Sequence, residues 1–345
     1  MITKTLAFMV TYGCNFKCAH CSVSSEPKLL AKQALFEKLM LKAIDEAYYI
    51  PSIKVIILFT GGEPTLKPRL LKKGIKYAAE KGFIVRLVTN AWWASSEEGA
   101  LEFLKELQEL GLNELNVSFD DFHKHFIKES NMIYAVKAAL KLEMKVAIAT
   151  TIHKYSEMRK EHIRKMLSNN GIDLTNIYIL EDHFQPLGRA KNLSDSLIDE
   201  EYVSKRYRAD LGCKRILEDI VVHPDGKVTV CCGHAIFEPE DVDYYIIGYL
   251  DKEDLETIIK RAQRNVLYWW LYLKEPQAIL KYLGYGLKDK KFLFPCYSCF
   301  YLMSKCKNEL YDVLTKRKET IFYEEILQVK PESKDIKELL RSLSS

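Results

Sequence analysis

Short apolar runs alternate with amphipathic helical patterns from residue 5 to about residue 190 of this 345-residue chain. The runs are rich in β-branched residues and predict six strands: Thr5–Thr11, Ile53–Thr60, Phe83–Thr89, Glu114–Phe119, Lys145–Ile152 and Asn176–Glu181. The helices predicted between them are Leu30–Tyr49, Pro68–Lys81, Glu97–Leu110, Ser130–Leu142 and Glu157–Asn169. Strands that alternate with helices over short loops pair in parallel, with right-handed crossovers. Because six strands are too few for a closed eight-stranded barrel, we expect an α/β fold with an open (β/α)6 partial barrel.

Three cysteines follow the first predicted strand in one short run, Cys14-Asn15-Phe16-Lys17-Cys18-Ala19-His20-Cys21. Three thiolates on one loop can hold three irons of a cubane cluster and leave the fourth iron open to a small ligand. The alternative is half of a zinc site. Structural zinc usually takes four ligands from paired C-x-x-C units, and no partner pair lies nearby in the sequence. The spacing therefore favours a catalytic iron–sulfur cluster.

The cysteine run resembles the signature C-x-x-x-C-x-aromatic-C of the radical S-adenosylmethionine (SAM) superfamily, with His20 at the aromatic position. The resemblance implies a 4Fe–4S cluster held by Cys14, Cys18 and Cys21. Its open iron would bind the amino and carboxyl groups of SAM. Reduction would then cleave SAM to a 5′-deoxyadenosyl radical.

The ends of the later strands carry the residues that this resemblance assigns to SAM, and sites in such folds gather at that edge of the sheet. The loop Gly61-Gly62-Glu63-Pro64 resembles the superfamily's G-G-E-P motif, which binds the methionine amino group of SAM. Polar side chains on the next strand ends commonly meet the ribose in that superfamily. The resemblance thus implies four further candidates, the first three for the ribose and the last for the SAM carboxylate: Asn90, Ser118, Asp120 and Arg189.

The second half of the chain predicts a small cysteine-rich α+β domain, beginning with a β-hairpin over residues 220–230 around Pro-Asp-Gly. Four ligands are available from Cys213, one of the adjacent pair Cys231 and Cys232, and the knuckle of Cys296 and Cys299. This set resembles the auxiliary-cluster domain (SPASM, or its shorter twitch form) of peptide-modifying radical SAM enzymes. The resemblance implies a second 4Fe–4S cluster. Structural zinc is the alternative, since four cysteines suit it as well.

Cys231 and Cys232 are adjacent, and successive residues on a strand point to opposite faces. If Cys231 is the cluster ligand, the thiol of Cys232 points elsewhere and stays free. A free thiol beside a radical site can donate a hydrogen atom while it is protonated. The pKa of a free cysteine is near about 8.5 and rises with apolar burial, so the thiol is the expected form. The alternative is that Cys232 is a small buried residue without a chemical role.

Several segments resemble the radical SAM peptide epimerases that form D-valine and D-isoleucine in ribosomally synthesised, post-translationally modified peptides. The likeness covers most of residues 5–306 and includes residues 18–21, 59–63, 90–92 and 219–238 and the Cys296/Cys299 knuckle. It implies that Cys232 donates the hydrogen atom and that Asp219 lies at the substrate. Cys213 precedes Asp219 by a longer spacing than this likeness leads us to expect, and Cys306 receives no role from it.

The expected function is therefore that of a peptide epimerase, an isomerase that takes the Cα hydrogen of an L-residue and returns one from the opposite face through Cys232. Two alternatives stay open. Another radical SAM peptide maturase would form thioether or C–C cross-links or dehydrogenated residues. A non-enzymatic scaffold would hold zinc at both cysteine sets. The partners expected for the enzyme are a ribosomal precursor peptide and an electron donor such as flavodoxin or ferredoxin.

Composition limits the remaining partners and the compartment. Charged residues make up 28% of the chain with a net charge of +4, and the lysine-rich segments are interrupted by acids, so we expect no nucleic acid partner. No apolar run is long enough to span a membrane, and no signal-peptide h-region is present, so we expect no membrane partner. Nine cysteines without an export signal predict a reducing cytoplasm. Three parts are expected: the barrel at 1–195, the auxiliary-cluster domain at 196–310 and a helical tail at 311–345.

Overall fold

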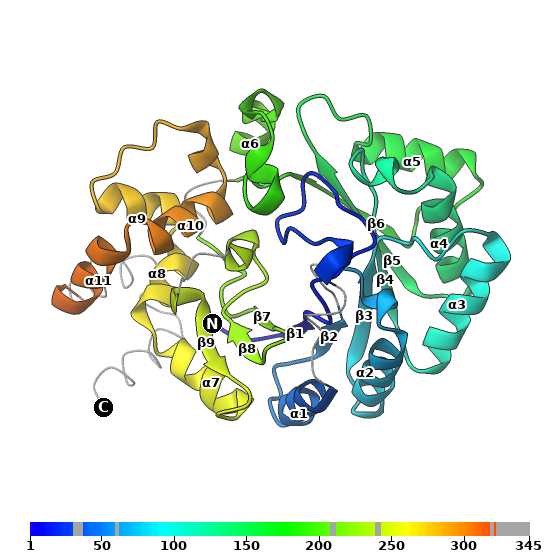
Figure 1. Ribbon diagram of the computed structural model, residues 1–345, viewed down its shortest axis with the longest axis horizontal. Helices are drawn as coiled ribbons and strands as arrows, with labels where there is room; N and C mark the ends of the chain where they lie inside the picture. Colours follow the sequence, from blue (N-terminus) through cyan, green and yellow to red (C-terminus); the bar gives the residue numbers. More distant parts are fainter. Residues whose placement is uncertain (30–36, 59–61, 208–211, 239–242, 318–320, 322–345) are drawn as a thin grey trace.

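The computed structural model describes residues 1–29, 37–58, 62–207, 212–238, 243–317 and 321 (Figure 1). The six predicted strands are present in one sheet: β1 Thr5–Phe8, β2 Val55–Leu58, β3 Ile84–Thr89, β4 Glu114–Ser118, β5 Lys145–Ile152 and β6 Ile177–His183. Each strand pairs in parallel with the next one along the chain. The α/β partial barrel expected from the sequence is therefore confirmed.

Amphipathic helices connect these strands: α1 Glu37–Tyr48, α2 Pro68–Glu80, α3 Glu97–Glu109, α4 Glu129–Lys141 and α5 Lys160–Asn169. Their buried residues recur at three- and four-residue spacing, as with Met40, Ala43, Ile44 and Ala47 of α1. Helix α3 shows how the sequence sets an end, because the Ser96 side chain accepts a hydrogen bond from the backbone N–H of Gly99. The first predicted helix was placed from Leu30, but residues 30–36 lie outside the described residues.

The strands of the second half extend the same sheet. They are β7 Asp219–Val222, β8 Lys227–Thr229 and β9 Ile246–Tyr249. β7 pairs in parallel with β1, with Thr5 opposite Asp219, and β8 and β9 follow in antiparallel order. The predicted hairpin is thus confirmed as β7–β8, whereas β9 and the pairing of β7 with β1 were not predicted. The described residues form a nine-stranded sheet that runs through both halves (Figure 1).

Short helices complete the second half: α6 Glu200–Arg206, α7 Leu255–Gln263, α8 Val266–Leu273, α9 Pro276–Tyr282, α10 Pro295–Ser304 and α11 Lys307–Lys316. Helix α8 belongs to the core, since its aromatic residues Trp269 and Trp270 are both buried. The domain boundary predicted at residue 310 falls inside α11, and of the tail predicted at 311–345 only residues 311–317 and 321 are described.

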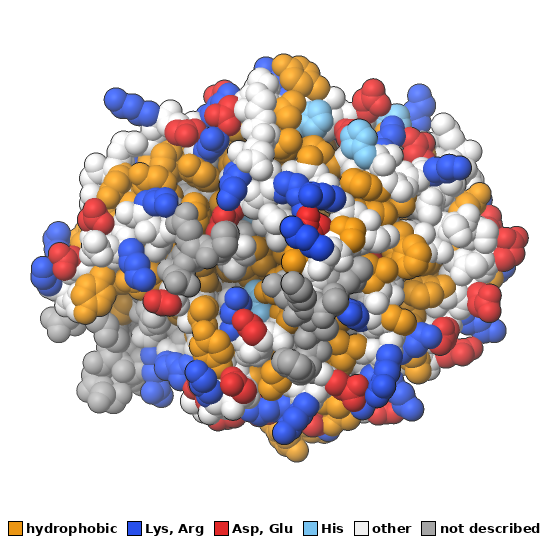
Figure 2. All heavy atoms as spheres, in the orientation of Figure 1, with side chains coloured by type: hydrophobic (Ala, Val, Ile, Leu, Met, Phe, Trp, Pro, Cys, Tyr) orange, Lys and Arg blue, Asp and Glu red, His pale blue; other side chains and the backbone are white. Residues whose placement is uncertain are grey.

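None of the described helices is both long and apolar enough to cross a membrane. On the face of the molecule shown in Figure 2, lysine and arginine side chains are interspersed with aspartate and glutamate.

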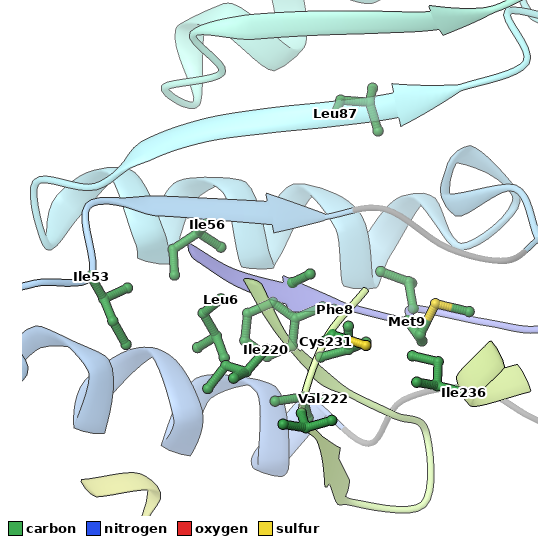
Figure 3. Close-up of a cluster of buried hydrophobic side chains, with 14 of the residues drawn as sticks. Leu6, Phe8, Met9, Ile53, Ile56, Leu87, Ile220, Val222, Cys231 and Ile236 are labelled. Carbon is green, nitrogen blue, oxygen red and sulfur yellow. The ribbon is translucent and has the colours of Figure 1, made fainter. Parts of the chain in front are cut away.

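A continuous hydrophobic core joins the two halves. Figure 3 shows Leu6 and Phe8 of β1 packed beside Ile220 and Val222 of β7, with Cys231 in the same cluster. Each fully buried side chain of this size contributes about 1.5–3 kcal/mol relative to exposure. The segment after β8 therefore packs against the barrel, with Cys231 in the shared core.

Candidate functional site

A cavity of about 320 Å³ lies at the C-terminal ends of the barrel strands. The cysteine run contributes Cys14, Cys18 and Cys21 to its wall. The ends of the next strands and their loops contribute four more of the predicted residues: Gly62, Glu63, Asn90 and Ser118. The second half contributes Cys232, together with His234 and Phe237. The structure thus brings most of the predicted SAM-site residues and the predicted hydrogen donor to one cavity.

The cysteine run forms a compact loop between β1 and α1. The backbone N–H of Cys21 donates to the Cys18 carbonyl at 3.2 Å, and that of Phe16 donates to the Cys14 sulfur at 3.3 Å. Burial, with the neighbouring thiols adding to it, raises the pKa of Cys14 to about 12 and that of Cys18 higher still. Buried thiols that resist ionisation, as Cys14 and Cys18 do, fit a site where bound iron supplies the compensating positive charge.

Two glycine turns press against this loop. A Cβ atom on Gly62 would lie 1.9 Å from the carbonyl oxygen of Gly13, and the next residue, Glu63, donates its backbone N–H to that oxygen at 2.9 Å. Gly188, in the left-handed region at φ +58°, approaches the other side, where a Cβ would lie 2.1 Å from the Ser22 carbonyl oxygen. Only glycine allows these contacts. Gly61, also predicted at the site, lies outside the described residues.

Arg189 holds the loop from the β6 side. Its backbone N–H donates to the carbonyl of Cys21 at 2.9 Å, and its guanidinium donates to the carbonyls of Cys18 and Ser25, each at 2.6 Å. The sequence suggested this arginine for the SAM carboxylate. In the structure both terminal nitrogens of the guanidinium donate to the protein backbone, and Arg189 is not among the described residues that line the cavity. Arg189 therefore acts as a clamp on the cysteine loop.

The carboxylate of Glu63 is buried and accepts hydrogen bonds from four protein donors. Oε1 accepts from the N–H and hydroxyl of Thr65 and from the hydroxyl of Thr89, while Oε2 accepts from the N–H of Asn90 at 2.8 Å. Burial raises the pKa of Glu63, although these hydrogen bonds oppose the rise. The arrangement ties the loop after β2 to the end of β3. Because Oε2 accepts from only one donor among the described residues, it is the oxygen that can accept a further hydrogen bond from a ligand.

Asn90 and Ser118 line the cavity, but Asp120 does not belong to the described lining. The carboxylate of Asp120 accepts from the ring of His123 at 2.8 Å and from the N–H of Thr151 at 3.2 Å, and it lies 3.8 Å from His20 Nε2. Burial alone would raise its pKa, but the two histidines and the hydrogen bonds hold that pKa well below its usual range. Asp120 thus braces the ring of His20, within the cysteine loop, and that of His123, and it does not belong to the described lining of the cavity.

The second set of cysteines gathers where α10 meets the segment after β8. A Cβ atom on Gly233 would lie 3.3 Å from the sulfur of Cys231 and 3.4 Å from that of Cys296, so both sulfurs face one point. Cys299 follows Cys296 by one turn of α10. Burial first, and then the thiols of this set, raise the pKa values of Cys213 and Cys299. Four mutually perturbing thiols fit a closed cysteine-ligated metal site.

Cys306 stands apart from this set. It is fully buried at the start of α11. The groups that perturb its pKa besides burial are Tyr285 and Glu309 and not the other cysteines. The structure therefore gives it the role of a small core residue.

The adjacent cysteines point to different surroundings. Cys231 is buried within the core cluster (Figure 3), whereas Cys232 lines the cavity. The Cys232 thiol donates to Asp219 Oδ2 at 3.5 Å, and Arg215 Nη1 donates to the Cys232 sulfur at 3.3 Å. Burial raises the pKa of Cys232 to about 11, against the opposing effect of the guanidinium. The thiol is accordingly the form present near neutral pH.

Sequence reasoning missed two residues beside Cys232. Arg215 contacts the sulfur of Cys232, and the His234 ring is hydrogen-bonded to the Ser22 hydroxyl at 2.8 Å, which joins the second half to the cysteine loop. The only signal for either in the sequence is its spacing, since Arg215 lies two residues after Cys213 and His234 two residues after Cys232.

The family model of the radical SAM superfamily matches residues 8–180, and that of the SPASM iron–sulfur cluster-binding domain matches residues 213–280. YydG of Bacillus subtilis, whose name assigns it to peptide biosynthesis, is 27% identical over 304 residues, which cover 86% of this chain and 88% of that protein. A GTP 3′,8-cyclase of Campylobacter jejuni subsp. jejuni is 29% identical over 294 residues, with coverages of 79% and 82%.

Among solved structures, the crystal structure of BtrN in complex with AdoMet and 2-DOIA aligns with a TM-score of 0.48 at 14% identity, over 81% of this chain and 90% of that one. The assignment rests on the two family models together with the two sets of cysteines. The chain belongs to the radical SAM superfamily, with SAM and a 4Fe–4S cluster as its cofactors and a SPASM domain that binds further iron–sulfur.

Proposed function

We propose that this protein is a radical SAM peptide epimerase that converts L-residues of a ribosomal precursor peptide into D-residues. The observation that carries the proposal is the position of Cys232, whose thiol lines the same cavity as the three cysteines of the catalytic loop. The likeness to a peptide biosynthesis protein over 86% of the chain supports a peptide as the substrate.

The cluster and SAM, when bound, supply the radical that removes the Cα hydrogen of the substrate residue. Cys232 then breaks its S–H bond and forms the new C–H bond on the other face of the planar carbon. The sulfur returns to the thiol by taking one electron and one proton. Because hydrogen transfer requires near-attack distances, the donor has to be held rigidly, and the two contacts on the Cys232 sulfur meet that need.

Asp219 and Arg215 set the direction of the Cys232 thiol. The sulfur accepts from Arg215 at 3.3 Å, and the S–H donates to Asp219 at 3.5 Å, so one contact occupies the lone pair and the other the hydrogen. Asp219 is also partly exposed, which leaves its carboxylate able to orient the peptide backbone and to pass a proton back to the sulfur.

The same proposal assigns roles to the remaining residues. Glu63 Oε2 receives the SAM ammonium group, and Asn90 and Ser118 receive the ribose. The cysteines Cys213, Cys231, Cys296 and Cys299 would hold the auxiliary cluster, which would supply the electron that restores the thiol of Cys232, the residue next to Cys231. A flavodoxin or ferredoxin supplies the electron for SAM cleavage.

Turnover in deuterium oxide tests the proposal, with candidate precursor peptides taken from the neighbouring open reading frames. Thiol hydrogens exchange with solvent, so each D-residue formed should carry one deuterium at Cα. Cys232→Ala should keep iron content and 5′-deoxyadenosine formation and should lose the D-residue. Cys231→Ala is the matched control at the neighbouring position and should instead lose auxiliary iron.

Other outcomes would point elsewhere. A product lighter by two hydrogens per event would assign the cross-linking or dehydrogenating chemistry. A D-residue formed without solvent deuterium, or the same phenotype in both cysteine variants, would contradict the role given to Cys232.

A further inference from the structure

A surface groove lies beside the cysteine loop and shares Phe16 with the wall of the SAM cavity. Its wall is made by Phe16 of that loop, Trp92, residues 124–128 and Tyr134 of α4. The lining includes two lysines and a histidine and, among the described residues, no aspartate or glutamate. Trp92 and Phe126 are exposed large aromatic side chains. The groove thus combines exposed aromatic side chains with a basic rim, which here means Lys124, His125 and Lys128.

A pair of stacked rings connects this groove to the catalytic loop. The backbone N–H of Phe16 donates to the Cys14 sulfur at 3.3 Å. The Phe16 ring stacks on Phe126 with a centroid distance of 5.1 Å and an interplanar angle of 13°. Phe16 is 5% exposed and Phe126 is 43% exposed. Phe16 therefore contacts both a ligand of the catalytic cluster and a side chain that is exposed on the molecular surface.

Reductive cleavage of SAM takes one electron from outside the protein for each event. Since electron transfer slows steeply with distance, a protein donor has to dock where the cluster site comes near the surface. The one-electron carriers expected as donors, flavodoxin and ferredoxin, are acidic proteins. Redox encounters of this kind use small, transient interfaces that are steered by opposite charge.

We propose that this groove is the docking site of an acidic one-electron donor protein. The donor is oxidised by one electron, and the catalytic cluster is reduced by that electron, which then enters the carbon–sulfur bond of SAM. The proposal applies to any chemistry performed on the peptide, because the electron is required before substrate reacts.

The two lysines contribute differently to the rim. Lys124 is partly buried and lies 3.3 Å from Glu129 and 3.9 Å from Glu157, which offset part of its charge. Lys128 is exposed and precedes the first residue of α4. A negative side chain is favoured at a helix N-terminus, so Lys128→Glu reverses the charge of the rim without weakening the helix.

The test measures binding and electron delivery in the holoenzyme variant K124E/K128E. An acidic flavodoxin is the probe for binding by titration calorimetry, and carbodiimide should cross-link it to Lys128 of the unmodified enzyme. We expect the variant to bind roughly tenfold more weakly at low salt, since reversing rim charges acts mainly on steered association. SAM cleavage driven by subsaturating flavodoxin should slow by a similar factor, while cleavage driven by dithionite should not change.

Lys260→Glu is the matched control. Lys260 is an exposed lysine of α7 with one acidic neighbour, Glu256 at 2.8 Å, and α7 lies across the molecule from α4 (Figure 1). Unchanged flavodoxin affinity in the K124E/K128E enzyme would overturn the proposal. So would a loss of precursor-peptide binding with flavodoxin binding intact, since that result would assign the groove to the peptide.

Discussion

The contacts of Arg189 allow a direct test of how the cysteine loop is held. Its guanidinium donates to the carbonyls of Cys18 and Ser25, each at 2.6 Å. A hydrogen bond from a charged donor contributes about 1.5–3 kcal/mol, and because Arg189 is only partly buried we take the lower end, about 3 kcal/mol for the pair. Since each 1.4 kcal/mol changes an equilibrium constant tenfold, Arg189→Ala should favour opening of the loop by roughly 100-fold.

The assay is the rate at which an iron chelator removes the catalytic cluster from anaerobically reconstituted protein. Iron loss should accelerate in Arg189→Ala, and the affinity for SAM should fall only as far as cluster is lost. Arg189→Lys should show most of the effect, because an ammonium group lacks the planar fork that reaches two carbonyls. Arg264→Ala, at an exposed arginine that ends α7, should match the unmodified protein.

One result would refute this reasoning. If the arginine variants kept normal iron content and normal chelation rates while SAM affinity dropped, the guanidinium would act on the SAM carboxylate, as the sequence suggested.

Three further predictions concern the same site. Gly62→Ala places a Cβ 1.9 Å from the Gly13 carbonyl oxygen, and this overpacking should lower the free energy of unfolding by about 1–3 kcal/mol or more. The variant should melt at a lower temperature, and an unchanged melting temperature would contradict the close approach. Glu63→Gln removes a charge-assisted hydrogen bond of about 1.5–3 kcal/mol, so SAM binding measured by equilibrium dialysis should weaken roughly tenfold or more while the iron content stays unchanged. An equal affinity for SAM would mean that Glu63 only makes hydrogen bonds within the protein. Cys306→Ser should keep all iron, because Cys306 lies apart from the other cysteines, and iron loss would make it a ligand.

The sequence was sufficient for the elements of the barrel because their signals are local. The strand predicted as Phe83–Thr89 is β3 Ile84–Thr89, and Lys145–Ile152 matches β5 at both ends. Apolar runs that end at turn residues determine such elements without reference to the rest of the chain. The cysteine loop and the Gly62-Glu63 turn were found for the same reason, since both are short runs with a fixed spacing.

The remaining features depend on contacts between distant residues. The pairing of Thr5 with Asp219 joins segments more than two hundred residues apart, and neither segment carries a signal for it. The direction of a polar side chain is equally non-local. Asp120 and Arg189 have the residue types of ligand-binding groups and lie in the expected loops. In the structure Asp120 is hydrogen-bonded to His123, and the Arg189 guanidinium donates to two backbone carbonyls beside the cysteines. The spacing of such residues in the sequence predicts which loop they occupy, but it does not predict which groups their side chains contact.

The pairing of β7 with β1 also bears on how one cavity can hold reactive groups from both halves of the chain. The cysteine loop follows β1, and Asp219, which contacts the Cys232 thiol, opens β7. The two strands are hydrogen-bonded neighbours over a shared core, so the loop after β1 and the thiol that follows β8 are anchored to one sheet. A displacement of about 1 Å at a reacting group can cost 100-fold in rate. A radical at Cα must be quenched from one defined face, so it tolerates such a displacement poorly. If the hydrogen atom arrives late or from the wrong face, the product is a damaged peptide or the starting residue. A donor carried on the extended sheet satisfies this requirement, whereas a donor on a separately moving domain would not.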